Sequence, residues 1–412
     1  MQLAKVLPFT AAAESDEASA AVGVDRILKA IRSHLGVDIA FVSRIADGEV
    51  VIRNLDSVPG APVAVGQAFP AEDGYCQRII DGRIPYLIPD TSQVAEVAGL
   101  ACTAELPVGS HISVPIRLRD GSVYGTFCCF GFSPDPSLNR RDLDALRAFA
   151  ELAAAHIQSE LDGDVARREI EGRVAEVVER DNLTILYQPV YRLSDRRVVG
   201  VEALARFPDA ASRPPDAWFS EADGVGLGVQ LELAAVRAAL RGLPYIPADV
   251  RLGVNVSPKT ILSAELARLV ESVPSGRLVL EITEHAVVRD YVDLKRALGP
   301  LRRHCAVAID DAGAGYSGLR HIVDIAPDLI KLDMSLTRGI DGDPARAALA
   351  TALVAFGREI GSRIVAEGVE TGAELATLER LGVGSGQGYF LQKPMPIAAA
   401  QFLFRRSLSP AD

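Results

Sequence analysis

The chain has 412 residues, of which 49% are hydrophobic and 24% are charged, and its formal net charge is -11. This length predicts two domains, and the composition is that of a globular chain. The negative charge argues against a partner of duplex nucleic acid, which needs a basic face. Because no apolar run approaches the roughly twenty residues of a membrane span and the N-terminus lacks a signal-peptide core, we expect a cytoplasmic protein without a membrane span.

The cysteine pattern points to free thiols. The cysteines are odd in number, lack metal-finger spacing and stand in largely apolar contexts, so we expect buried free thiols in a reducing compartment. They are Cys76, Cys102, Cys128, Cys129 and Cys305.

The N-terminal part reads as a small domain with an antiparallel sheet. Residues 1–20 are rich in Ala, Ser and Glu and are expected to be disordered. Residues 24–34 have helical spacing that ends before Gly36, and strand-like runs follow at 38–45, 48–56, 111–119 and 122–132. The last two runs predict a hairpin with Asp120 and Gly121 in its turn.

A helical pattern connects this domain to the rest of the chain. Apolar residues recur with helical spacing over 143–157 and 170–178, which predicts one long helix or two helices that abut around 162–164. We place the domain boundary near 160–170, with a linker helix at 161–182. The apolar stripe of this helix suggests the seam of a parallel homodimer, through which a change in the first domain could move two C-terminal domains against each other.

Residues 183–405 alternate strand-like and helical segments, and polar side chains stand mostly where a short apolar run ends. This pattern predicts a TIM-like (β/α) barrel with its site at the carboxyl ends of the strands, within a chain of mixed α/β and α+β class. The polar residues are Glu202, Asn255, Glu281, Asp310, Asp311, Lys331, Glu367 and Gln387.

The donor atoms of this set favour hard divalent cations. Five carboxylates and one amide, without cysteine or histidine, favour Mg²⁺ or Mn²⁺ over Zn²⁺. The adjacent Asp310 and Asp311 could bridge two such ions, an arrangement that suits displacement at phosphorus. Lys331 is suited to holding a water molecule or a phosphoryl oxygen.

The C-terminal part resembles the EAL-domain cyclic di-GMP phosphodiesterases. The segment YQPVYRLSDRRVVGVEALARF contains the Glu-Ala-Leu signature at 202–204. The further blocks NVSPKT, LEITE, IDDAGAGYSGL, IKLD, AEGVET and QGYFLQKPMP follow in order, so the resemblance covers about 180–405.

This resemblance implies a role for each matching residue. The expected metal ligands are Glu202, Asn255, Glu281, Asp310 and Asp311. Lys331 and Glu367 are expected to orient and activate the attacking water, and Glu284 to anchor the loop after the aspartate pair. The expected substrate contacts are Gln188, Leu204, Arg206 and Gln387. The implied reaction is hydrolysis of cyclic di-GMP to linear 5′-pGpG with two Mg²⁺ or Mn²⁺ ions.

Two departures from the family pattern stand out. Ala312 and Ala314 replace the usual Phe and Thr in the loop after the aspartate pair, which puts regulation and rate in question more than the chemistry. The segment GVGSG before Gln387 is richer in glycine than usual, which could loosen the entry of that strand.

Residues 21–160 resemble a GAF domain, through the phrase GSHISVPIRLRDGSVYGTFCCFGF and the order of the predicted elements. GAF domains commonly bind small molecules or dimerise. Tyr75, Cys76, Cys102 and His111 are candidate pocket residues, and His111 could ligate a haem, although we favour packing against the sheet. Whether this domain holds a small molecule or none stays open.

Two alternatives to the enzyme are a receptor that binds cyclic di-GMP without hydrolysing it and a signalling scaffold. Receptors of this kind typically lose a ligand position, and this sequence keeps them all. The sequence therefore favours the phosphodiesterase.

Overall fold

The structure is a computed structural model that describes residues 13–208, 213–283, 291–312 and 317–407. The chain divides into two compact units, Met1–Arg168 and Glu169–Asp412. Helices in the described ranges do not combine the length and the apolar composition that crossing a membrane requires.

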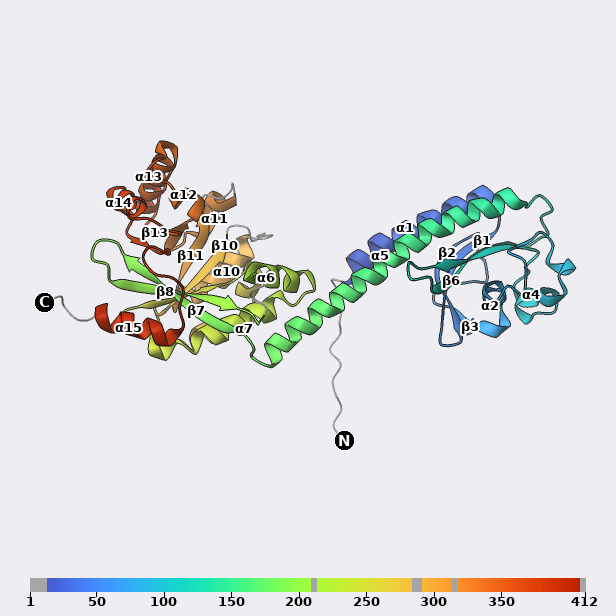
Figure 1. The fold of residues 1–412 in the computed structure, drawn as a ribbon, viewed down its shortest axis with the longest axis horizontal. Helices are drawn as coiled ribbons and strands as arrows, with labels where there is room; N and C mark the ends of the chain where they lie inside the picture. The colour runs from blue at the N-terminus through green and yellow to red at the C-terminus, as the bar shows by residue number, and fades with distance from the viewer. Residues whose placement is uncertain (1–12, 209–212, 284–290, 313–316, 408–412) are drawn as a thin grey trace, which may run out of the picture. The chain divides into compact units, whose positions relative to one another are not determined.

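The N-terminal unit is built on an antiparallel sheet with the strand order β3-β2-β1-β6-β5-β4 (Figure 1). Its elements are α1 (Ala13–Leu35), β1 (Ile39–Ala46), β2 (Glu49–Ser57), β3 (Ala68–Pro70), α2 (Tyr75–Ile80), β4 (Leu87–Ile88), α3 (Ala95–Ala98), α4 (Ala101–Glu105), β5 (Ser110–Arg117), β6 (Val123–Gly131) and α5 (Arg140–Glu179). The expected hairpin is confirmed, because β5 and β6 pair antiparallel across the turn that holds Gly121. Helix α1 begins at Ala13 and so includes part of the segment expected to be disordered.

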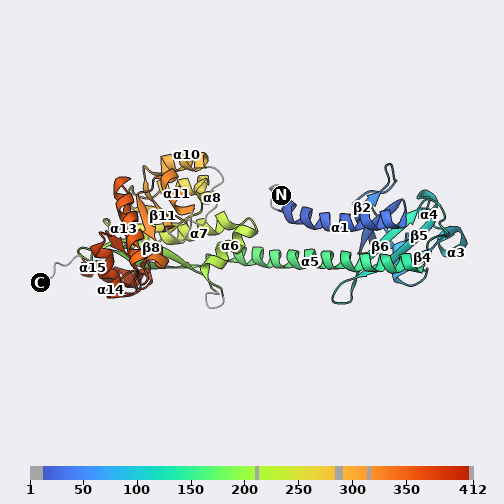
Figure 2. The ribbon, with the colours of Figure 1, turned by 90° about the horizontal axis from the view of Figure 1, so that it is seen from above.

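Two hydrophobic clusters lie on opposite faces of this sheet, because successive side chains of a strand point to opposite sides. Leu28 of α1 and Leu146 of α5 pack with Cys129 on one face, where the two helices run side by side (Figure 2). Cys76 and Ile79 of α2 pack with Cys128 on the other face.

Helix α5 is continuous, which settles the choice between one helix and two in favour of one. Most of its apolar stripe packs within the chain: Ala153 and Ile157 join the core of the N-terminal unit, and Val174 and Val177 pack in the C-terminal unit. Of the positions that suggested a dimer seam, the structure leaves Leu152, at 55%, and His156 exposed. The stripe therefore has a structural use that does not need a second chain.

The C-terminal unit is a closed barrel of eight strands, counted within the described residues, which confirms the barrel expected from the sequence (Figure 1). Its elements are β7 (Thr184–Arg192), β8 (Val198–Arg206), α6 (Pro215–Gly224), α7 (Gly228–Leu240), β9 (Arg251–Asn255), α8 (Pro258–Ile261), α9 (Ala264–Glu271), β10 (Leu278–Thr283), α10 (Tyr291–Leu301), β11 (Cys305–Ala312), α11 (Ser317–Ile325), β12 (Leu329–Leu332), α12 (Met334–Thr337), α13 (Pro344–Glu359), β13 (Arg363–Ala366), α14 (Gly372–Arg380), β14 (Ser385–Gly386) and α15 (Ile397–Ser407).

The barrel differs from a wholly parallel one at its first strand. Strand β7 pairs antiparallel with both β8 and β14, while the strands from β8 to β14 pair parallel in sequence order. A hairpin at 193–197 joins β7 to β8, and such a short connection can join only antiparallel strands. The parallel strands bring their carboxyl ends to one end of the barrel, where the polar residues gather.

An aromatic cluster anchors the start of α6 to the end of β8. Phe207 stacks on Trp218 with ring centroids 4.7 Å apart, and both side chains are buried. The guanidinium of Arg173, from α5, lies 5.8 Å from the centre of the Trp218 ring. Since Trp218 is the only tryptophan of the chain, its fluorescence reports on this unit alone.

Replacing Phe207 with Ala is expected to lower the free energy of unfolding of the barrel by about 3–5 kcal/mol, because the change leaves a cavity beside Trp218. Urea unfolding followed by Trp218 emission measures the loss. Phe402→Ala, at a side chain that is 70% exposed, is the control and should leave the midpoint unchanged. An unchanged midpoint for Phe207→Ala would show that this cluster does not hold the barrel together.

Candidate active site

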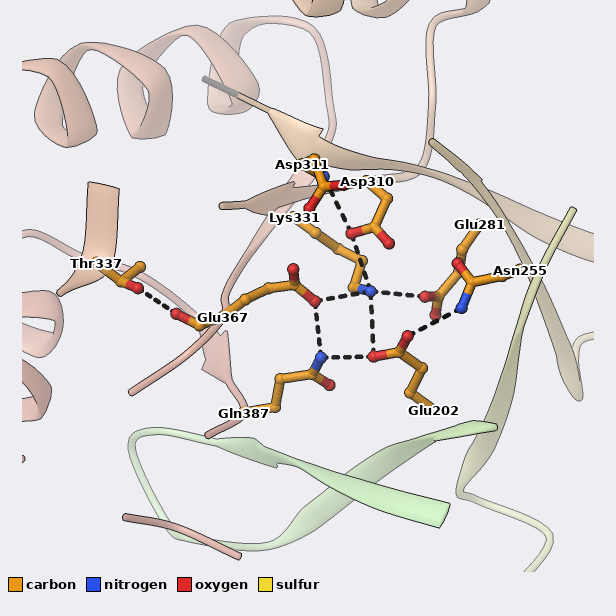
Figure 3. A network of polar contacts seen from close by, with 9 residues as sticks. All are labelled: Glu202, Asn255, Glu281, Asp310, Asp311, Lys331, Thr337, Glu367 and Gln387. Carbon is orange, nitrogen blue, oxygen red and sulfur yellow. Dashed lines mark hydrogen bonds and ion pairs between the residues drawn. The ribbon is translucent and has the colours of Figure 1, made fainter. Parts of the chain in front are cut away.

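The eight polar residues selected from the sequence meet at one end of the barrel (Figure 3). They come from seven successive parallel strands: Glu202 from β8, Asn255 from β9, Glu281 from β10, Asp310 and Asp311 from β11, Lys331 from β12, Glu367 just after β13, and Gln387 just after β14. Glu202 departs from the expected pattern, because it lies in the middle of β8 and not at the end of the strand.

Lys331 lies at the centre of this cluster. Its Nζ atom is within ion-pair distance of four carboxylates: Glu281 Oε2 at 2.7 Å, Glu367 Oε1 at 2.7 Å, Asp310 Oδ1 at 3.0 Å and Glu202 Oε2 at 3.3 Å. The Lys331 side chain is 4% exposed, and the four carboxylates are nearly as deeply buried. A single positive charge is therefore the shared counter-ion of four carboxylates.

This imbalance shifts the protonation of the cluster. Burial, joined by the charges of Glu202 and Asp310, raises the pKa of Glu281 to about 8, against the opposing effect of Lys331. Burial likewise raises the pKa of Glu367 well above its usual value. Without a further cation, the cluster thus keeps protons at neutral pH that exposed glutamates would lose.

Glu202 is shifted in the opposite direction. Burial works to raise its pKa, but the charge of Lys331 and hydrogen bonds from Gln387 and Asn255 outweigh burial and lower it. The Nδ2 atom of Asn255 donates to Glu202 Oε1 over 3.0 Å. The Nε2 atom of Gln387 donates both to Glu202 Oε2 over 2.6 Å and to Glu367 Oε1 over 2.7 Å. Glu202 is therefore held as a carboxylate.

The backbone of β11 turns two consecutive carboxylates toward the same place. In a regular strand Asp310 and Asp311 would point to opposite faces. Asp311 has a left-handed backbone conformation with φ 57°, and the pairing with β12 is irregular between Ile309 and Ala312. The backbone N–H of Asp311 donates to Asp310 Oδ1 over 3.1 Å. Strain of this kind concentrates at functional sites, where the surrounding structure holds it in place.

The donor atoms fit a pair of divalent cations. Glu202, Glu281 and Asp310 bring one oxygen each to within 4.8 Å of one another, and so do Asp310, Asp311 and Glu367. Asp310 belongs to both groups, as a residue that bridges two ions would. In addition, Oε1 of the buried Gln387 has no hydrogen-bond partner, so an acceptor beside the carboxylates is left unsatisfied. Buried oxygen donors with excess negative charge are suited to Mg²⁺ or Mn²⁺.

The remaining predicted substrate contacts lie beside Glu202 on the hairpin of β7 and β8. Gln188 pairs directly with Glu202 across the two strands, so their side chains share a face. Leu204 and Arg206 follow Glu202 at alternate positions of β8 and lie on that face too, farther toward its carboxyl end. The structure thus places all three on the side of the cluster. Glu284 and Ala314, by contrast, lie outside the described residues.

Three residues that support the site were not selected from the sequence. A methyl group at Gly253 would lie 2.0 Å from Oε1 of Glu281, so a larger residue in β9 would displace this carboxylate from its present position. The hydroxyl of Thr337 donates to the backbone carbonyl of Glu367. Glu374 forms a capping box with Thr371 and also accepts from the backbone N–H of Gly339, which fixes the segment after Glu367. Two of these residues carry a sequence signal: Gly253 is a glycine within a strand, and Thr371 and Glu374 form the T-x-x-E pattern of a helix cap.

The candidate pocket of the N-terminal unit is a small cavity. Tyr75, Cys76, Cys102 and His111 line it together with apolar side chains, and its volume is about 50 Å³. His111 is buried with its ring centroid 4.5 Å from that of Tyr75, and burial lowers its pKa to about 3. This agrees with a packing role, and the cavity has no room for a haem, since sites for larger ligands typically have at least about 300 Å³.

Family models match both units. Residues 171–394 match the EAL domain, and residues 23–157 match the GAF domain. MucR of Pseudomonas aeruginosa, a bifunctional diguanylate cyclase/cyclic di-GMP phosphodiesterase, is 33% identical over 239 residues, which cover 54% of this chain and 34% of MucR. PdeN of Escherichia coli, a probable cyclic di-GMP phosphodiesterase, is 30% identical over 233 residues, which cover 53% of this chain and 45% of PdeN.

A solved structure of the PaMucR phosphodiesterase in complex with c-di-GMP is 31% identical and has a TM-score of 0.50. The similarity covers 56% of this chain and 99% of that structure. The chain spans between about a third and less than half of the length of the curated relatives that it matches first.

Replacing Lys331 with Met tests the charge balance of the cluster. The variant is expected to lose about 3–5 kcal/mol of barrel stability at pH 8, because the buried carboxylates lose their counter-ion. The loss should be smaller at pH 5. Glu281 and Glu367 have higher pKa values in the folded than in the unfolded chain, so they hold protons at pH 5, and the stability they contribute falls as the pH rises toward about 8.

Urea unfolding in the presence of a chelator, followed by Trp218 emission at both pH values, measures this difference. Lys259→Met, which breaks an exposed ion pair with Asp223, is the matched control and should cost less than about 1 kcal/mol at either pH. A loss for Lys331→Met that is equal at pH 5 and pH 8 would contradict the assigned protonation states.

Proposed function

The chain belongs to the EAL domain family, and we propose that it hydrolyses one phosphodiester bond of cyclic di-GMP to give linear 5′-pGpG. The observation that carries the proposal is the complete cluster of five carboxylates, two amides and Lys331 at the carboxyl ends of the barrel strands. The names of MucR and PdeN support the activity, and the bound c-di-GMP of PaMucR supports the substrate.

The proposed cofactors are two Mg²⁺ or Mn²⁺ ions. Glu202, Asn255, Glu281 and Asp310 would hold one ion, and Asp310 and Asp311 would hold the other, in line with the two overlapping groups of oxygen donors. When bound, such ions supply positive charge to the phosphate and to the attacking water.

Lys331 and Glu367 are proposed to orient and to deprotonate the attacking water, respectively. The ammonium of Lys331 is buried and can donate to the water or to a phosphoryl oxygen, so it would orient the reactants. The Glu367 carboxylate lies 2.7 Å from that ammonium and would take the proton of the water. Gln387 and Thr337 hold the two ends of Glu367, through its side chain and its backbone carbonyl respectively, and so position this base.

The substrate is proposed to lie over β7 and β8. Gln188 and Leu204 would contact the nucleotide, and Arg206 would pair with a phosphate, because these residues follow the face of Glu202 toward the carboxyl end of β8. Glu284 keeps its proposed role as the anchor of the loop after Asp311.

Regulation by the N-terminal unit is also part of the proposal. Helix α5 contributes to the cores of both units, so a change in packing in the GAF unit can reach the barrel through one continuous helix. We also propose a homodimer, in which a second chain would cover Leu152 and Val165, the exposed large hydrophobic residues of this helix.

The test is full-length protein incubated with cyclic di-GMP and Mg²⁺ or Mn²⁺, with the products separated by chromatography. We expect 5′-pGpG, its loss with a chelator, and a rate at least about 100-fold lower for Glu202→Gln, which removes a charged ligand. Glu379→Gln, at an exposed glutamate that pairs with Arg196, is the control and should keep the wild-type rate.

Measurable binding of cyclic di-GMP without product, in either metal, would favour the non-hydrolysing receptor. If the protein neither binds nor hydrolyses cyclic di-GMP, the result would favour the signalling scaffold.

A further inference from the structure

Two buried cysteine side chains face each other in the core of the N-terminal unit. The Sγ atoms of Cys76, on α2, and Cys128, on β6, lie 3.9 Å apart, although 52 positions separate them in the sequence. Both side chains are almost wholly buried. This distance is near van der Waals contact, so the sulfur atoms need to approach by only about 2 Å to reach the length of a disulfide bond.

A small polar network surrounds the two thiols inside an otherwise apolar cluster. The hydroxyl of Thr126 lies 3.0 Å from the Cys128 sulfur and 2.8 Å from the hydroxyl of Ser43. The Ser43 hydroxyl in turn lies 3.8 Å from the Cys76 sulfur. Two hydroxyls and two thiols thus form a ring in which each group has a hydrogen-bonding neighbour. Such a ring can stabilise a thiolate that a purely apolar core could not hold.

The electrostatics distinguish the two cysteines. The hydrogen bond from the Cys128 thiol, with smaller contributions from Thr126 and Ser43, lowers the pKa of Cys76 to about 7 despite burial. Burial raises the pKa of Cys128 well above its usual value. Cys76 is therefore the more acidic thiol of the pair, and it is also the one that lines the neighbouring cavity.

Cys76 can be reached by a small molecule. It lines the cavity of about 50 Å³, together with Cys102, whose side chain is half-exposed. A cavity of this size admits a molecule as small as water or hydrogen peroxide.

We propose that Cys76 and Cys128 are a modification site at which a hydroperoxide forms a reversible intramolecular disulfide. The Cys76 thiolate attacks the peroxide, the O–O bond breaks, and Cys76 becomes a sulfenic acid, while the other oxygen takes up the proton that Cys76 lost and leaves as water. The Cys128 sulfur then attacks Cys76 Sγ, and the hydroxide that leaves takes the Cys128 proton to form water. The two thiols lose two electrons and two protons in all, and the peroxide gains them.

The disulfide would tie α2 to the middle of the sheet. Strand β6 lies between β1 and β5, and α2 packs over it on the face that holds the cavity. The crosslink closes a long loop, so it restricts the unfolded chain and raises the melting temperature of this unit until a reductant removes it. The proposal does not depend on the activity of the barrel.

The test treats full-length protein with hydrogen peroxide at neutral pH, alkylates the remaining thiols in denaturant, and maps the peptides without reduction. We expect the five alkylated cysteines to fall to three, a peptide that joins Cys76 to Cys128, and full recovery after dithiothreitol. Mapping the wild-type chain does not depend on whether a cysteine variant folds.

Cys129→Ala is the matched control, because Cys129 is the next residue of β6 and points into the cluster on the opposite face. This variant should keep the crosslink, whereas Cys128→Ala should lose it and trap Cys76 as a sulfenic or sulfinic acid. A crosslink between Cys76 and Cys102, or five cysteines that stay alkylated after treatment, would overturn the proposal.

Discussion

The buried contact between Lys331 and four carboxylates is the interaction on which the barrel site depends. Desolvation makes each of these charges costly by itself, and the ammonium offsets only part of that cost. Neighbouring residues support this arrangement: Gln387 bridges Glu202 and Glu367 through hydrogen bonds, and Gly253 in β9 leaves the space that the Glu281 carboxylate occupies. The surrounding residues therefore hold these buried charges in place.

An excess of buried negative charge links stability to function. The cluster keeps protons on Glu281 and Glu367 at neutral pH, because burial raises the pKa of both side chains and the charge of Lys331 does not offset it. Buried carboxylates repel one another once they lose their protons. A divalent ion that displaced those protons would relieve this repulsion and would therefore bind tightly. We propose that this repulsion prepares the site for metal and for a phosphodiester, a trade of stability for activity that enzymes commonly make.

The sequence predicted which residues gather in the cluster, because a polar residue after a short apolar run is typical of a strand that ends at the rim of a barrel. It could not predict the antiparallel direction of β7, or that Glu202 lies within β8, because both depend on how the barrel closes. The contact between Cys76 and Cys128 was equally out of reach, since it joins a short helix to a distant strand. Periodicity shows that one face of α5 is apolar but not what covers it, so the sequence alone could not show that most of this stripe packs within the chain.

Calorimetric titration of Mn²⁺ into the chelator-treated 412-residue chain tests directly whether the buried carboxylates hold two metal ions. We expect two ions per chain and a binding enthalpy that changes with the buffer, because binding at pH 7 would release protons from Glu281 and Glu367. Asp310→Asn, at the residue that both donor groups share, should weaken both binding events. Binding without proton release would contradict the protonated state of Glu281 and Glu367, and no binding above that of the Asp310→Asn variant would contradict a metal site at this cluster.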